Sequence, residues 1–404
     1  MRIFLCMVTG IVAIIACNKK VAPTPVNTTY TVTVNNGYGS GTYKPGDTVH
    51  IFSKEWTADQ TFDKWNGDIS VLPSGNEWHE WFVMPAKDIA VTAVIKQAAV
   101  FTPVSTTIRG KNIMKQVYYY FPANHKGIVY LLHGSGGQAS NWINLFEYYS
   151  FIKDLVTDGF GFVITEAEER SLNTDTNGDG SIRWALAPVD TINNVDYANI
   201  RIINDTLINR GLTTHEKPRY SVGMSNGGAF SAALSLAYKF KAGVSYCAQS
   251  GAIIAQLTQS PLQYCMAQND NNDNVGQAGN AEANNNSQTI VSRGICSNIF
   301  FNERSPLYSE RFARRPDISL ALSRNIFNEI KSKGYLDDKN YFKDYSSFLN
   351  ADFIANPSSF PVLNSLTIAQ KIFVSDQLDC TVSDHKFYSD LNKTTIKFLD
   401  SQCN

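Results

Sequence analysis

The residues whose types and spacing best suit catalysis lie at positions 223–228, which read Gly-Met-Ser-Asn-Gly-Gly. Residues 218–222, Pro-Arg-Tyr-Ser-Val, are predicted to form a strand before them, and the Ala- and Leu-rich run at 227–238 predicts a helix after them. A serine held on a sharp strand-to-helix turn is exposed to a base, and the helix N-terminus favours the negative charge that develops during attack. Small residues are needed on both sides because the backbone folds sharply there. We therefore predict that Ser225 is a nucleophile.

Acyl transfer from such a serine also needs donors for the oxyanion, and the sequence offers them in a second glycine-rich segment. Residues 133–137, His-Gly-Ser-Gly-Gly, directly follow the apolar run 127–132, which predicts a strand buried on both faces. A backbone amide at this position can join the amide that follows the nucleophile. We assign the two donors to Ser135 and Asn226. His133 is not expected to be the catalytic base, because in hydrolases with a serine on such a strand-to-helix turn the base follows the acid along the chain. It is expected to brace the loop.

The order serine, acid, histidine also selects the other two catalytic candidates. The apolar run 262–267 ends in Gln-Asn-Asp, and Asp270 is the predicted acid, with Asp273 as the alternative. Of the six histidines, only His385 follows Ser225. We expect it to come after a strand at 372–374 and before a final helix at 387–399. Ser225, Asp270 and His385 would then form a catalytic triad.

These motifs, in this order, resemble the polyhydroxybutyrate depolymerase and feruloyl esterase branch of the secreted α/β hydrolases, over about residues 105–295. The resemblance implies an α/β fold, with a mostly parallel sheet flanked by helices, and an esterase with neither cofactor nor metal. Its substrates would be feruloyl or acetyl esters of polysaccharides, or aliphatic polyesters. A serine peptidase of the same fold is the alternative enzyme. A surface-binding protein with an inactive hydrolase domain is the alternative from another functional class.

One polar segment is compatible with calcium. Residues 175–180, Asp-Thr-Asn-Gly-Asp-Gly, have oxygen-bearing side chains at positions 1, 3 and 5, as the start of an EF-hand calcium loop does. Position twelve of that loop would be Leu186 and not Glu. An ordinary turn rich in Asn, Asp and Gly is therefore favoured over a calcium site.

The N-terminus has the features of a targeting segment. Arg2 precedes an apolar stretch at 3–15, which is too short to span a bilayer comfortably and is typical of a signal peptide. It ends in Ile-Ile-Ala-Cys, which resembles the lipobox of bacterial lipoproteins, with Cys17 as the lipidated residue. A plain signal peptide and a marginal anchor helix are the alternatives. We expect a cell-envelope lipoprotein of the bacterial outer membrane, held by its lipid alone, with residues 18–27 as a tether.

The remaining chain divides into two predicted domains. Residues 28–97 alternate apolar and polar, as strands do, and their motifs at 43–47, 62–68 and 84–89 resemble the divergent InlB B-repeat. A single copy suggests a spacer or adhesive module. Its four tryptophans are expected to pack in its core rather than to bind carbohydrate; they are Trp56, Trp65, Trp78 and Trp81. Residues 98–404 form the predicted catalytic domain, with a helical insertion at about 304–371.

Charge and cysteine content set further limits. The formal net charge of -1 gives no basic field that would attract phosphates, so nucleic acid is not an expected partner. A monomer is expected. Five cysteines lie beyond the targeting segment, so at least one must stay free. A bond between Cys380 and Cys403 is one possibility, while Cys247 and Cys265 lie in apolar runs and are as easily buried thiols.

Overall fold

The computed structural model describes residues 28–54 and 57–403. Its largest element is an eight-stranded sheet with the order β15-β14-β13-β12-β10-β11-β9-β8. The last six strands in chain order pair in parallel, and β8 and β9 pair antiparallel at one edge. This is the strand order of the α/β-hydrolase fold, as predicted. The strands are β8 (Val104–Arg109), β9 (Met114–Tyr120), β10 (Ile128–Leu132), β11 (Gly161–Ile164), β12 (Arg219–Met224), β13 (Ala242–Tyr246), β14 (Leu262–Ala267) and β15 (Ser297–Asn302).

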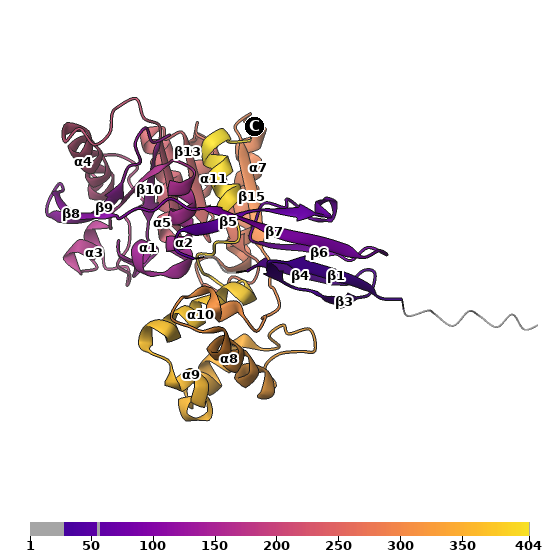
Figure 1. Ribbon diagram of the computed structural model, residues 1–404. Helices are drawn as coiled ribbons and strands as arrows, with labels where there is room; N and C mark the ends of the chain where they lie inside the picture. The colour runs from indigo at the N-terminus through magenta and orange to yellow at the C-terminus, as the bar shows by residue number, and fades with distance from the viewer. Residues whose placement is uncertain (1–27, 55–56, 404) are drawn as a thin grey trace, which may run out of the picture.

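Helices cover both faces of this sheet (Figure 1). One face packs against α2 (Phe146–Thr157) and α11 (Asn392–Ser401), and the opposite face packs against α4 (Val195–Asn209), α5 (Asn226–Tyr238) and α7 (Gly276–Ser292). Because both faces are covered, the central strands are apolar throughout, and every residue of β10 is buried. The shorter helices are α1 (Asn141–Asn144), α3 (Glu168–Leu172) and α6 (Ala252–Leu257). Within the described residues, no helix has the length and apolar character needed to cross a membrane.

Residues 30–97 form a small β domain of two facing sheets. One has the order β3-β1-β7-β5 and the other the order β2-β4-β6. Trp65 is buried in the core of this domain, and Trp78 is buried where the domain meets the helical unit, with the Arg314 guanidinium 3.9 Å from the centre of its ring. Trp81 is half-buried, and Trp56 lies outside the described residues. The strands are β1 (Tyr30–Asn35), β2 (Gly37–Tyr38), β3 (Gly41–Tyr43), β4 (Thr48–Ser53), β5 (Gln60–Gly67), β6 (His79–Val83) and β7 (Ile89–Gln97).

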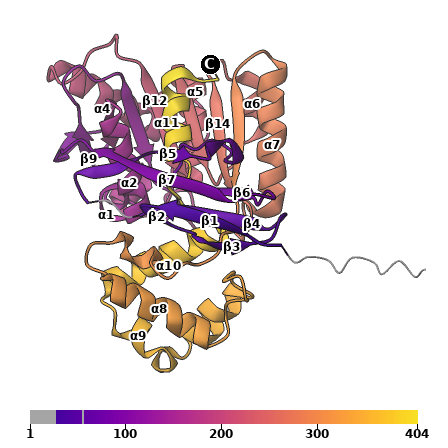
Figure 2. The same ribbon diagram turned by 45° about the vertical axis from the view of Figure 1, so that its right-hand side comes forward.

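The segment between β15 and His385 is a helical unit with an apolar core of its own. It contains α8 (Leu320–Ser332), α9 (Pro361–Ser365) and α10 (Ile368–Val382), together with short 3-10 and π-helical turns. Figure 1 and Figure 2 both show these helices as a separate group below the large sheet. The β domain contacts both other units, since Phe52 stacks on Tyr308 of the helical unit and His79 bonds Asp390 of the hydrolase domain.

The structure corrects the strand predicted at 372–374, because these residues lie inside α10. Their apolar run belongs to a helical stripe in which Phe373, Val374, Gln377, Leu378 and Thr381 are buried. A capping box at Thr367 and Gln370 begins the helix. The final helix, α11, begins at Asn392 and not at 387, since residues 385–391 form a loop.

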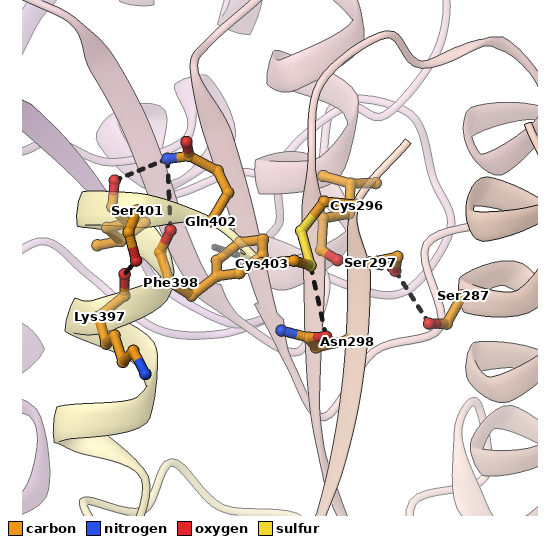
Figure 3. The surroundings of a disulfide bond; sticks show 11 residues. Ser287, Cys296, Ser297, Asn298, Lys397, Phe398, Ser401, Gln402 and Cys403 are labelled. Carbon is orange, nitrogen blue, oxygen red and sulfur yellow. Dashed lines mark hydrogen bonds between the residues drawn. A yellow bond between two sulfur atoms is a disulfide. The ribbon is translucent and has the colours of Figure 1, made fainter. Parts of the chain in front are cut away.

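The structure also corrects the disulfide. Cys403 bonds to Cys296 and not to Cys380 (Figure 3). Cys380 is a buried free thiol on α10, as are Cys247 and Cys265 in the sheet. Cys296 directly precedes β15, so the bond fixes the end of the chain, after α11, to the edge strand of the sheet.

Candidate active site

Ser225 lies on the predicted turn between β12 and α5. Its φ of 55° and ψ of -127° place a non-glycine residue in a strained conformation that is common at functional sites. The turn depends on its glycines: a Cβ at Gly223 would lie 2.0 Å from the carbonyl oxygen of Gly227, and one at Gly227 would lie 2.4 Å from that of His133. The strained turn presents the Ser225 side chain above the carboxyl end of the sheet.

The structure brings Ser225, His385 and Asp270 together. His385 Nε2 lies 2.9 Å from Ser225 Oγ, and His385 Nδ1 lies 2.7 Å from Asp270 Oδ2. The Asp270 side chain is fully buried and that of His385 is 15% exposed, so the carboxylate is shielded while the imidazole reaches the surface of a cleft. The other candidate for the acid, Asp273, is exposed on the same loop. The arrangement can abstract a proton from the serine hydroxyl.

Asp270 and His385 meet because their two loops are joined by hydrogen bonds. The backbone amide of Gln268 donates to Ser383 Oγ at 2.7 Å, and that of Asn269 donates to the Ser383 carbonyl at 2.9 Å. Ser383 is the left-handed residue that ends α10, and it turns the chain toward the cleft. The helical unit thus delivers His385 to the same sheet edge as a direct strand connection would.

The two predicted oxyanion donors also lie at the cleft. Ser135 and Asn226 both line it beside Ser225. Asn226 is the first residue of α5, so its N–H has no acceptor within the helix and the helix N-terminus adds positive potential. A Cβ at Gly134 would lie 3.2 Å from the Ser225 Cβ, which shows how closely the glycine-rich loop approaches the nucleophile. These amides can stabilise an oxyanion formed at Ser225.

Two residues that the sequence did not indicate hold these donors in place. The Asn226 side chain accepts from the backbone N–H of Trp184 at 2.8 Å and donates to its carbonyl at 3.2 Å, while the Trp184 indole donates to the His133 carbonyl at 2.9 Å. The Arg170 guanidinium donates to the carbonyls of Gly136 and Gly137 at 2.7 and 2.8 Å. Neither residue belongs to a short motif, so only the folded structure reveals these contacts.

His133 braces the loop, as predicted. Its Nε2 accepts from the backbone N–H of Ala167 at 3.1 Å, so the proton is on Nδ1, which donates to the Gly134 carbonyl at 2.7 Å. Burial lowers the pKa of His133 to about 4, which keeps the ring neutral at pH 7. It is therefore part of the support of the loop.

The cleft around Ser225 has a volume of about 790 Å³. One part of its lining is apolar and includes Leu186, Val189 and Ile254. Another part carries the amide side chains of Gln249 and Asn272. A cleft of this size and mixed character can hold a small organic group next to the nucleophile.

The side chains that could ligate a metal have other roles. In the described chain one group of metal-binding types lies close together, formed by Cys247, Asp270 and His385 with ligand atoms within 4.8 Å of one another. Burial raises the pKa of the Cys247 thiol well above its usual range, and a protonated thiol is a poor ligand. In the candidate calcium loop, Asp175 accepts from the amides of Gly178 and Gly180, and Asp179 pairs with Arg183 at 2.6 Å. Both carboxylates therefore stabilise a turn.

No family model matches this sequence, and no curated protein matches it. Among solved structures, a dienelactone hydrolase from Anabaena variabilis is similar with a TM-score of 0.40 and 14% identity, over 50% of this chain and 87% of its own. A ferulic acid esterase is similar with a TM-score of 0.37 and 11% identity, over 50% and 89%. An acylaminoacyl peptidase from Pyrococcus horikoshii is similar with a TM-score of 0.36 and 12% identity, over 67% and 50%. The α/β-hydrolase fold of this chain rests on its own strand order and strand-to-helix turn.

Proposed function

We propose that this chain is a serine carboxylic ester hydrolase. The observation that carries the proposal is the continuous hydrogen-bonded series from Asp270 through His385 to the Ser225 hydroxyl, which ends in a cleft beside two backbone donors. A serine hydroxyl becomes an effective nucleophile when a positioned base accepts its proton.

The proposed reaction follows from these positions. Ser225 Oγ attacks the ester carbonyl carbon while His385 Nε2 takes its proton, and Asp270 holds the Nδ1–H and stabilises the imidazolium. The amides of Ser135 and Asn226 hold the negative oxygen of the tetrahedral intermediate. The C–O bond then breaks, and His385 returns the proton to the departing alcohol. Water hydrolyses the acyl-enzyme by the same steps and restores Ser225.

The proposed substrates are exported or polymeric esters, either feruloyl or acetyl groups on polysaccharides or an aliphatic polyester. The cleft supports this class through its volume and through apolar and amide side chains on its walls. A peptidase of the same fold would use the same triad, so substrate preference must be measured.

The test combines covalent labelling with a substrate panel. A fluorophosphonate probe should label the wild type and fail to label Ser225→Ala. The wild type should cleave p-nitrophenyl acetate and at least one feruloyl, acetyl or polyester substrate, and it should leave peptide anilides intact. Faster cleavage of peptide anilides would establish the peptidase instead. A wild type without labelling or turnover would indicate an inactive hydrolase domain with a binding role.

We further propose that the enzyme is a lipoprotein of the cell envelope, anchored through Cys17, which lies outside the described residues. Cys17→Ser should move the protein from the membrane fraction to the soluble fraction while turnover on p-nitrophenyl acetate stays the same, because anchor and triad lie far apart in the sequence. Immunoblots of the two fractions measure the first effect. Unchanged membrane retention would argue against lipidation at Cys17.

A further inference from the structure

The loop that carries His385 contacts the β domain before it enters α11. Asp390, five residues after His385, accepts from His79 Nδ1 at 2.6 Å. The backbone amides of Lys393 and Thr394 donate to the Glu77 carboxylate at 3.2 and 2.7 Å. His79 begins β6 and Glu77 lies just before it. One short segment of the β domain therefore fixes the far end of the histidine loop.

Glu77 acts as the N-terminal cap of α11. The N-cap residue of this helix, Leu391, has no side chain that can accept a hydrogen bond, so the first-turn amides need an acceptor from elsewhere. The Glu77 side chain supplies it from the β domain, and Glu77 is only 5% exposed. Burial raises the pKa of Glu77 to about 8, and its side-chain oxygens accept from these amides in either protonation state. Without this side chain the half-buried amides would lose their acceptor, and the start of α11 would be free to shift.

The contact between His79 and Asp390 continues into the helical unit. His79 Nε2 lies 3.0 Å from His50 Nδ1, and His50 Nε2 lies 2.9 Å from the Tyr341 hydroxyl. If Tyr341 donates to His50, His50 to His79, and His79 to Asp390, then every nitrogen of both rings has a partner. This series links all three units through the buried His50 and Asp390 and the half-buried Tyr341.

The loop itself is too tightly packed to absorb a shift at one end. Between His385 and Asp390, Phe387 and Tyr388 are buried in the core of the sheet, and the Ser389 amide donates to the buried Glu147 at 2.9 Å. Because Asp390 directly follows Ser389, a displacement of Asp390 that disturbs the Ser389–Glu147 contact would reach His385. A misplacement of about 1 Å at a catalytic group can lower a rate by about a hundredfold.

We propose that the β domain is part of the catalytic apparatus, in that His79 and Glu77 are positioning residues that hold the His385 loop against Ser225. This proposal rests on the proposed esterase function for its kinetic readout. It replaces the expectation of a spacer or adhesive module with a role inside the enzyme.

The kinetic test compares two substitutions at the same position. His79→Leu removes the donor to Asp390, whereas His79→Asn keeps an N–H near the position of Nδ1. With p-nitrophenyl acetate, we expect His79→Leu to lower kcat about tenfold or more with little change in KM, and His79→Asn to stay within about threefold of the wild type. The control is Asp47→Asn, which weakens the exposed contact between Asp47 of the β domain and Lys339 at 3.2 Å and should leave kcat unchanged.

A second measurement does not depend on turnover. Hydrogen exchange followed by mass spectrometry should show faster exchange of residues 385–394 in His79→Leu, and wild-type rates there in Asp47→Asn. If the wild type hydrolyses no ester, the proposed function fails, and the exchange rates still decide whether the β domain holds the loop.

A His79→Leu enzyme with wild-type kcat, even if its melting temperature falls, would overturn the proposal, and so would unchanged exchange in residues 385–394. Equal loss of kcat in the Leu and Asn variants would also overturn it. If His79→Leu does not fold, Glu77→Met and its conservative counterpart Glu77→Gln take its place, with the larger loss of kcat expected for Met.

Discussion

Two histidines of this protein bond a buried aspartate through Nδ1, and they differ in what surrounds them. His385 lies 2.7 Å from Asp270, and His79 lies 2.6 Å from Asp390. The pairs are nearly identical in distance, and in both the aspartate is buried. The His385 pair lies at the cleft, whereas the His79 pair lies where the β domain and the hydrolase domain meet.

The difference lies at the other ring nitrogen. His385 Nε2 faces the Ser225 hydroxyl on a strained turn, next to backbone donors and an opening of about 790 Å³. His79 Nε2 faces another buried ring, that of His50, and His79 does not line the cleft around Ser225. An Asp-His pair therefore becomes catalytic only where a nucleophile, oxyanion donors and space for substrate lie beside it. Elsewhere the same pair acts as a structural contact.

Breaking the pair at the cleft should give the largest effect. His385→Ala should lower kcat on p-nitrophenyl acetate about a thousandfold or more, close to the effect of Ser225→Ala, because the base and the nucleophile act as one unit. The double variant should be little slower than either single one. Circular dichroism checks that the fold is intact. An active His385→Ala enzyme would contradict the assignment of the base. The His385–Asp270 pair would then not be the catalytic one of the two pairs.

Removing the disulfide tests whether the stability of the protein and the positioning of the His385 loop are independent. Replacing Cys296 and Cys403 with serine opens a link that spans 107 residues, for which chain entropy gives a loss of about 5 kcal/mol in the free energy of unfolding. The bond lies at the far end of α11 from the histidine loop, so kcat should not change. Urea denaturation and steady-state kinetics measure the two effects. A large loss of kcat here would show that catalysis follows global stability, and it would weaken the specific role given to His79.

The third prediction concerns the support of the oxyanion donors at the cleft. Asn226→Ala keeps the backbone N–H but removes both hydrogen bonds to Trp184. We expect kcat to fall about tenfold to a hundredfold, less than the loss reported for removing a donor outright, with KM nearly constant because the transition state is affected more than the bound substrate. Asn285→Ala on the exposed face of α7 is the control. An unchanged kcat would show that the helix alone fixes the amide of residue 226.

The sequence was sufficient to predict the pair of His385 and Asp270 at the cleft. It could not predict the pair of His79 and Asp390. Ser225, Asp270 and His385 could be selected because the order of strands delivers their loops to one sheet edge, and the apolar runs of β10 to β14 mark those strands. The three-residue apolar run at 372–374 could not distinguish a strand from a helix, although Thr367 and Gln370 carried a capping signal. His79 and Asp390 are separated by 311 positions and have no motif, so only the fold brings them together.

The smallest predicted effect is a pH dependence of stability that comes from the buried series. Burial, and to a lesser extent the neighbouring His79, lowers the pKa of His50 to about 2, against the opposing charge of Asp390. In the unfolded chain His50 titrates near 6.5, so below that pH the unfolded state binds one proton more than the folded state. The free energy of unfolding must therefore fall as the pH falls, by at most about 1.4 kcal/mol per pH unit from this group.

A variant without the titrating ring isolates this contribution from those of other groups. His50→Asn should be less stable than the wild type at pH 7, because the bonds to His79 and Tyr341 are altered, and the gap should narrow at pH 6 and again at pH 5 as the wild type loses its advantage. Urea denaturation at the three pH values gives both curves. Parallel curves would mean that His50 takes up its proton equally in both states. The His50 ring would then be accessible to water. The His79–Asp390 pair would no longer have a buried neighbour at Nε2, which is the feature that distinguishes it from the His385–Asp270 pair.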